Sequence, residues 1–240
     1  MFKPIIVIPF FNHGMAFKKI APCLKKMNCP ILVVNDGSAA AETQLLNQLC
    51  QEHQFVCLHC SKNGGKGAAV KKGLNWAFSN GYSHALQIDA DGQHNLDDVA
   101  DFLNLAQNRS DCIIAAQPIY DRTAPKSRLY GRRITNFWVW LETGGRFKMD
   151  TMCGFRVYPL EQIKKILPYI WFNRMGFDVE ILVKSYLNKI PIVGKKTQVI
   201  YQENGVSHFR PFKDNFEISC VHACLCVYSI WKLLTRWRNS

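Results

Sequence analysis

The sequence is poor in acidic residues, and features that mark several classes of protein are missing from it. Its 18 aspartates and glutamates stand against 30 lysines and arginines, which gives a formal net charge of +12. Such a chain attracts nucleic acid, anionic lipid or phosphorylated small molecules, and charge alone does not choose among them. No low-complexity tract is present and 48% of the residues are apolar, which excludes a disordered chain. At 240 residues we expect one folded domain.

Signals for export and for a membrane span are also lacking. The N-terminal segment MFKPIIVIPFF has no signal-peptide cleavage pattern, and the ten cysteines lack the spacing of a metal site, so we expect free thiols in the cytoplasm. The last predicted helix, 214–237, has an apolar centre that His222 and Lys232 interrupt. It falls short of the ~20 apolar residues that a span needs, so we expect it to lie on the anionic inner face of the cell membrane.

Apolar, β-rich runs alternate with stretches of helical length and pattern. This alternation predicts right-handed βαβ units and therefore an α/β fold, with a mostly parallel sheet flanked by helices on both faces. A C-terminal amphipathic helix follows, and we expect a main domain over 1–210 and this helix over 211–240. The predicted strands of the first half of the chain lie at 4–10, 30–36, 54–60, 84–89 and 111–118.

Polar residues gather where these runs end. The first run leads into Asn12 and His13, the second ends in Asn35 and Asp36, and the fourth leads into an Asp-Ala-Asp segment. Ligands of open α/β sheets bind at the carboxyl ends of the strands. We therefore expect these side chains to share one cleft.

Two aspartates crowd the end of the fourth run, in HALQIDADGQHN (84–95). Asp89 and Asp91 are spaced to meet one side of a hard divalent cation such as Mg²⁺ or Mn²⁺, which would offset their repulsion. Gly92 lets the chain turn sharply behind them. The alternative is that Asp91 or Asn95 only caps the following helix, but capping needs one aspartate and not a pair. The pair favours a metal site.

The glycine-rich stretch NGGKGAAVKKG (63–73) places a lysine at the start of a predicted helix. It lacks the spacing and the Ser or Thr of a P-loop. A glycine-rich turn with Lys66 at a helix N-terminus nevertheless suits a phosphate or a nucleobase. For Lys71 and Lys72 we prefer the plainer interpretation of a solvated helix face. Lys66 is therefore a candidate donor-binding residue.

Taken in order, VIPFFNHG, VVNDGS, NGGKGAA, DADGQH and DTMCGFRVYP resemble the motif series of family 2 glycosyltransferases of the GT-A fold. The sequence is most similar to the dolichyl- or polyprenyl-phosphate sugar synthases, over about residues 4–210. The resemblance implies a Rossmann-like GT-A domain and an inverting, metal-dependent transferase. Its donor would be a nucleotide diphosphate sugar and its acceptor a membrane lipid, foremost polyprenyl phosphate. A hydroxyl acceptor on a lipid or glycan is the alternative.

The resemblance also implies roles for individual residues in donor binding. It places Pro9 and Asp36 at the nucleoside, with Asp36 meeting the base. Asp89 and Asp91 match the pair that contacts the metal and the diphosphate, and Gln93 matches a glutamine that joins the metal shell.

On the acceptor side, the resemblance implies an arginine-rich loop that binds lipid phosphate, matched here by Arg128, Arg132 and Arg133. Further along, His208 and Arg210 in SHFRP could line the diphosphate or acceptor site or simply fasten the last helix, and we expect His208 to face the diphosphate.

The nature of the acceptor decides whether a catalytic base is needed. Negative charge grows on the departing diphosphate, and a metal held by Asp89 and Asp91 would stabilise it. A phosphate acceptor is already anionic and needs only positioning, for example by Arg128. A hydroxyl acceptor needs a base, and Asp178 and Glu180 in GFDVEILVK are the candidates. They are two apart at a helix start and do not share a face, so at most one of them reaches the cleft. Asp178 could instead cap its helix, and we expect Glu180 to be solvated.

Two other functions compete with this interpretation. A nucleotidyltransferase would be expected to show a glycine-rich loop with a basic tail after the first strand, which IPFFNHGMAF does not offer. A non-enzymatic basic module that binds membranes or nucleic acid would explain the charge but not the crowded aspartates. We therefore expect a glycosyltransferase that uses Mg²⁺ or Mn²⁺ and binds no nucleic acid.

Overall fold

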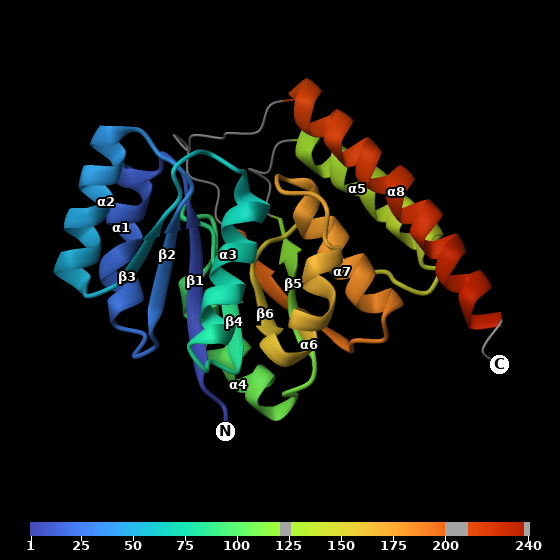
Figure 1. The fold of residues 1–240 in the computed structure, drawn as a ribbon, viewed down its shortest axis with the longest axis horizontal. Coiled ribbons are helices and arrows are strands. Elements are labelled where there is room, and N and C mark those ends of the chain that lie inside the picture. The colour runs from blue at the N-terminus through green and yellow to red at the C-terminus, as the bar shows by residue number, and fades with distance from the viewer. Residues whose placement is uncertain (121–125, 200–210, 238–240) are drawn as a thin grey trace.

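The computed structural model describes residues 1–120, 126–199 and 211–237 (Figure 1). The side chains of residues 126–128, 211, 212, 214, 236 and 237 are outside this description. In these ranges a seven-stranded sheet has the order β3-β2-β1-β4-β6-β5-β7. The strands are β1 (Pro4–Phe10), β2 (Ile31–Asn35), β3 (Val56–His59), β4 (His84–Gln87), β5 (Ile113–Ile119), β6 (Arg156–Pro159) and β7 (Ile192–Gln198).

The predicted α/β architecture is confirmed. Strands β1 to β4 are parallel to one another, and β5 is parallel to β7. The helices are α1 (Gly14–Lys25), α2 (Ala40–His53), α3 (Lys66–Ser79), α4 (Val99–Asn108), α5 (Lys126–Glu142), α6 (Leu160–Ile166), α7 (Gly176–Leu187) and α8 (Pro211–Trp237). Two short 3₁₀ helices are η1 (Leu96–Asp98) and η2 (Leu167–Tyr169).

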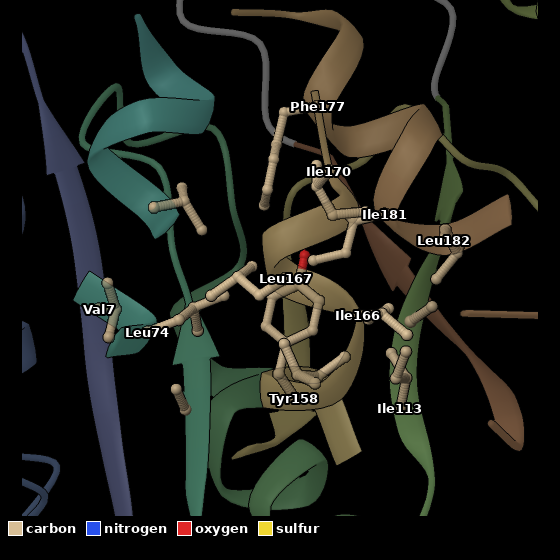
Figure 2. Close-up of a cluster of buried hydrophobic side chains, with 14 of the residues drawn as sticks. Val7, Leu74, Ile113, Tyr158, Ile166, Leu167, Ile170, Phe177, Ile181 and Leu182 are labelled. Atoms are coloured by element: carbon tan, nitrogen blue, oxygen red, sulfur yellow. The ribbon is translucent and has the colours of Figure 1, made fainter. Parts of the chain in front are cut away.

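Helices cover both faces of the sheet because successive side chains of a strand point to opposite faces. In β1, Ile6 and Ile8 pack with buried residues of α1, α2 and α4, whereas Ile5 and Val7 pack with those of α3, α6 and α7. Figure 2 shows part of the core on the face of Ile5 and Val7, where side chains of α3, α6, η2 and α7 pack against the sheet. Its labelled members include Val7, Leu74, Ile113, Tyr158, Ile166, Leu167, Phe177 and Ile181.

Strand β6 runs opposite to its neighbours β4 and β5. Its first residue, Arg156, pairs with Gln87 at the carboxyl end of β4. Because of this reversal, the segment that enters β6 arrives at the same edge of the sheet as the carboxyl ends of the parallel strands. Residues 150–155 therefore lie beside the Asp-Ala-Asp segment that follows β4.

The two helices α5 and α8 lie side by side beyond the sheet (Figure 1), and α8 also packs on α7. Among the described side chains of α8, the buried apolar ones are Ile218, Val221 and Leu225. By length and composition alone, Asn215–Thr235 is long and apolar enough to cross a membrane, so the expectation that its apolar part falls short of a span is wrong. That the helix lies on the membrane surface stays a prediction.

Candidate active site

A cleft of about 1430 Å³ lies at the carboxyl edge of the sheet. Its floor is formed by the ends of β1, β2 and β4 and by the start of α3, and one wall is formed by α5 and α8. Of the polar residues at the strand ends, His13, Asp36, Asp89 and Asp91 line this cleft as expected, whereas Asn12 and Asn35 are not part of its lining. The predicted residues that line the cleft are Pro9, Asp36, Lys66, Asp89, Asp91, Gln93, Arg132 and Asp178.

Lys66 lies at the centre of the charged floor. Its Nζ is 2.9 Å from Asp89 Oδ2 and 2.8 Å from Asp178 Oδ2. Burial disfavours the ammonium, but the two carboxylates outweigh burial and hold the pKa of Lys66 above its usual range. The sequence predicted Lys66 as a donor-binding residue; the structure adds that it joins two segments 89 residues apart, counted from Asp89 to Asp178.

Asp89 carries an ionised carboxylate in a half-buried position. Burial opposes its ionisation, yet Lys66 and the His94 ring, whose Nε2 is 3.4 Å from Asp89 Oδ2, hold the pKa of Asp89 well below its usual range. Its Oδ1 atom is buried and has no hydrogen-bond partner in the described part of the chain. One carboxylate oxygen is therefore engaged by Lys66, and the other is left for a cation or a ligand donor.

Among the residues after Asp89, Asn95 caps the following helix and Asp91 does not. Asn95 accepts a hydrogen bond from the Asp97 amide and so caps η1. Asp91 does not cap that helix; its Oδ1 accepts from the amide of Gln93 in the turn, 3.0 Å away. Since the cap comes from Asn95, the capping alternative does not account for the aspartate pair.

His94 is a site residue to which the sequence analysis assigned no role. It is buried, stacks on Phe155 with ring centroids 5.1 Å apart, and faces Asp89. The sequence held a signal for this role, because a histidine within a few residues of two aspartates can donate a hydrogen bond to one of their carboxylates. Gln87 was also missed; a glutamine inside the apolar run before Asp89 needs a buried partner.

Gln87 connects the sheet to α7. Its Nε2 donates to Asp178 Oδ1 over 3.4 Å, and its Oε1 accepts from the Tyr158 hydroxyl over 3.2 Å. Burial raises the pKa of Tyr158 to about 12, so its hydroxyl keeps the proton that it donates. The Arg156 guanidinium, fully buried, donates to the carbonyl oxygens of Asp178 and Thr151. These contacts fix the position of Asp178 at the start of α7.

Asp178 and Glu180 have different environments. Asp178 lines the cleft, and its contact with Lys66 makes it an ion-pair partner; its role as a base stays a prediction. The expectation of a solvated Glu180 is wrong, because this residue is 1% exposed. Its carboxylate accepts from the amides of Trp171 and Phe172 and pairs with Lys184. The turn before α7 bends back over the helix, and only the tertiary fold shows it.

Asp36 organises the glycine-rich turn before α3. Its two carboxylate oxygens accept hydrogen bonds from the amides of Gly64 and Gly65, at 2.9 and 2.7 Å. Burial raises the pKa of Asp36 although these amides favour the charged form. Gly65 has φ +101°, and an added Cβ would lie 2.5 Å from the Asn173 oxygen, so only glycine fits there. The predicted contact of Asp36 with a base stays a prediction.

The predicted acceptor arginines differ in position. Arg132 lines the cleft and forms an ion pair of 2.6 Å with Asp150, whereas Arg133 is exposed and outside the cleft lining. The Arg128 backbone belongs to α5, but its side chain lies outside the described residues, as do His208 and Arg210 entirely. Their predicted roles stay predictions.

Comparison with known proteins agrees with the motif order and the fold. The model of the family "Glycosyl transferase family 2" matches residues 5–164, more than half of the chain. A dolichyl-phosphate beta-glucosyltransferase of Dictyostelium discoideum is 27% identical over 81% of this chain, which spans 61% of that relative's length. A polyprenol monophosphomannose synthase of Mycolicibacterium smegmatis is 26% identical, over 85% of this chain and 80% of the relative.

The fold is shared with solved structures. One is the crystal structure of glucosyl-3-phosphoglycerate synthase from Mycobacterium tuberculosis in complex with Mn²⁺, uridine diphosphate and glucosyl-3-phosphoglycerate. The TM-score is 0.65 at 14% identity, and the match covers 98% of this chain and 79% of that one. This likeness concerns the fold, which is of the GT-A type. The family match, the motif order and the fold agree, and the chain belongs to glycosyl transferase family 2.

Proposed function

We propose that this glycosyltransferase moves a sugar, with inversion, from a nucleotide diphosphate sugar to polyprenyl phosphate at a membrane surface. One observation carries the proposal: a single cleft joins the acidic floor of the sheet to a wall of two helices whose outer surface is apolar. The names of the two relatives, a dolichyl-phosphate beta-glucosyltransferase and a polyprenol monophosphomannose synthase, support it.

The acidic floor suits a divalent metal. Asp89 Oδ1 is a buried oxygen without a partner, and Asp91 and Gln93 also line the cleft with oxygen donors. Among the described residues no three His, Cys, Asp or Glu side chains form a metal-binding group, so the protein would supply part of the shell and the donor diphosphate the rest. Mg²⁺ or Mn²⁺ bound there would stabilise the charge of the departing diphosphate. Lys66 keeps Asp89 ionised for that purpose.

The wall of the cleft suits a lipid chain. The lining that α5 and α8 present to it includes the apolar side chains of Ile134, Trp138, Ile218, Ala223 and Cys226, beside polar side chains such as Thr135 and Ser219. Arg132 lines the same wall, and a guanidinium there suits the phosphate head of the acceptor. Because that phosphate is already anionic, no base is needed, and Asp178 serves to hold Lys66.

The outer surface of the same two helices suits a membrane. Large apolar side chains that are at least 39% exposed occur along both helices, and such a concentration marks an interaction surface. We propose that residues 211–240 attach the 1–210 domain to the cytoplasmic face of the cell membrane, together with α5. These exposed residues are Phe137, Trp140 and Leu141 on α5, and Phe216, Val227, Ile230, Trp231, Leu233 and Leu234 on α8; Tyr130, Ile134 and Trp138 of α5 are also exposed but line the cleft.

A transfer assay tests the proposed function. Nucleotide diphosphate sugars are screened for hydrolysis and transfer with Mn²⁺ or Mg²⁺, with and without polyprenyl phosphate. We expect metal-dependent turnover that polyprenyl phosphate stimulates and that Asp91→Asn reduces on the order of a hundredfold or more, since an electrostatic contact to the developing charge is lost. Donor turnover that only hydroxyl acceptors stimulate would refute the lipid-phosphate acceptor. Absence of turnover with every donor and metal would refute the whole proposal.

A further inference from the structure

A buried pair of polar residues joins α5 to α8 inside the cleft wall. Glu142 Oε1 is 2.7 Å from His222 Nδ1. The Glu142 side chain is 0% exposed and that of His222 is 6% exposed. The His222 ring also stacks on Trp138, with centroids 6.2 Å apart and an angle of 27°. Glu142 and His222 are 80 residues apart in the sequence, so the sequence did not suggest a pair.

The pair has unused hydrogen-bonding capacity. His222 Nε2 and Glu142 Oε2 are both buried and have no partner in the described part of the chain. Of the two residues, His222 belongs to the lining of the cleft. Glu142 therefore holds one ring nitrogen of a residue that lines the cleft, while the other ring nitrogen is buried without a partner in the described part of the chain.

Stability does not account for this arrangement. Replacing a buried ion pair by apolar residues of similar size is often neutral or stabilising, because two groups no longer have to be desolvated. An apolar pair in the same position would leave no polar atom buried without a partner. Stability therefore gives no reason for a polar pair here.

We propose that His222, oriented by Glu142, binds the phosphate head of the lipid acceptor through Nε2. This inference rests on the proposed function and names a further residue of its acceptor site. With Nδ1–H donated to Glu142, protonation of Nε2 gives a second N–H that donates to a phosphate oxygen, and the carboxylate supplies the compensating charge. Glu142 is a positioning residue, since it acts through the ring.

The test compares the full-length native protein with the double variant Glu142→Leu/His222→Leu. The paired change removes both polar groups at once, so neither is left buried alone, and the melting temperature reports whether the fold is kept. Transfer is measured with farnesyl phosphate as a short acceptor, and farnesol is used as a competitor that has the same chain without the phosphate.

We expect the KM for farnesyl phosphate to rise on the order of tenfold or more, as for a lost hydrogen bond to a charged group. The donor KM, metal-dependent donor hydrolysis, inhibition by farnesol and the melting temperature should stay within about twofold or a few degrees of the native values. Glu142→Gln keeps an acceptor for Nδ1–H but not the charge, so it should raise the KM for farnesyl phosphate by less than the double variant does. Glu142→Asp keeps both the acceptor and the charge, so it should raise this KM by less than Glu142→Gln does.

Two results overturn the inference alone: an unchanged KM for farnesyl phosphate in the folded double variant, or an equal weakening of farnesyl phosphate and farnesol. The second result would place His222 at the chain and not at the phosphate. If the native protein transfers no sugar to farnesyl phosphate or to longer polyprenyl phosphates, the proposed function fails first and the inference fails with it.

Discussion

Replacing Glu180 by glutamine is the sharpest test of the structure, because the sequence and the fold predict opposite results. A solvated glutamate could be changed to glutamine at almost no cost. In the structure, however, its carboxylate accepts from the Trp171 amide at 2.9 Å and from the Phe172 amide at 2.8 Å. It also neutralises Lys184, whose side chain is 2% exposed.

The magnitude follows from what Glu180→Gln leaves behind. The Lys184 ammonium keeps one hydrogen bond, to the Tyr169 carbonyl oxygen, and its contact with the Trp171 ring, but it loses its counter-charge. The new amide NH₂ also faces backbone N–H groups. Breaking a buried pair in this way costs about 3–5 kcal/mol of unfolding free energy. At about 2–4 °C per kcal/mol for a chain of this size, the melting temperature should fall by about 6–20 °C.

Thermal unfolding followed by circular dichroism measures the effect. Glu52→Gln is the matched control, because the Glu52 side chain is 69% exposed, and it should change the unfolding free energy by no more than about 0.5 kcal/mol. Adding Lys184→Met to Glu180→Gln removes the stranded charge and should recover part of the loss. The reasoning is refuted if Glu180→Gln melts within about 2 °C of the native protein, because a change of about 0.5 kcal/mol in the control variant corresponds to a shift of that size.

Two further predictions concern the cleft and its outer wall. In Gly154→Ala the new Cβ would lie 2.6 Å from Lys66 Nζ and from Gln87 Nε2, so donor turnover should fall at least about tenfold. In the control variant Gly131→Ala the new Cβ has nothing within 4 Å, and the change should stabilise α5 by up to about 1 kcal/mol. Equal turnover in the two variants would contradict the prediction. Leu234→Asp, on the exposed face of α8, should weaken co-sedimentation with phosphatidylglycerol vesicles without lowering the melting temperature; the same loss in Asn47→Asp on α2 would show a mere charge effect.

The strands and the carboxyl edge were predictable from local pattern. Buried parallel strands appear in a sequence as short apolar runs. Strands β1, β2 and β4 correspond to three such runs, and each strand ends one or two residues before a polar residue, Asn12, Asp36 and Asp89 respectively. The residues of the reversed strand β6 were visible within the motif DTMCGFRVYP, but the direction of the strand was not, because antiparallel pairing leaves no mark in a four-residue run. Its direction is what sets residues 150–155 beside Asp89.

The contacts that tune the site could not be read from the sequence. The sequence suggested that Lys66 faces a phosphate, that Asp178 acts as a base and that Glu180 is solvated, and it did not join Glu142 to His222. Each of these residues meets a partner from another element, and a pattern along the chain carries no distance between elements. Residues that share a local turn, such as Asp91 and Gln93, were within its reach.

The sequence by itself determined the α/β class, the family and the acidic end of the fourth strand, because these depend on short-range periodicity and on the order of motifs along the chain. The tertiary structure decided which charges are neutralised and which stay free for ligands. Lys66 engages one oxygen of Asp89 and leaves the other without a partner, while Lys184 and two amides enclose Glu180 entirely. The physical reason is that ionisation and hydrogen bonding depend on separation in space and on burial, which only the packing of the elements sets.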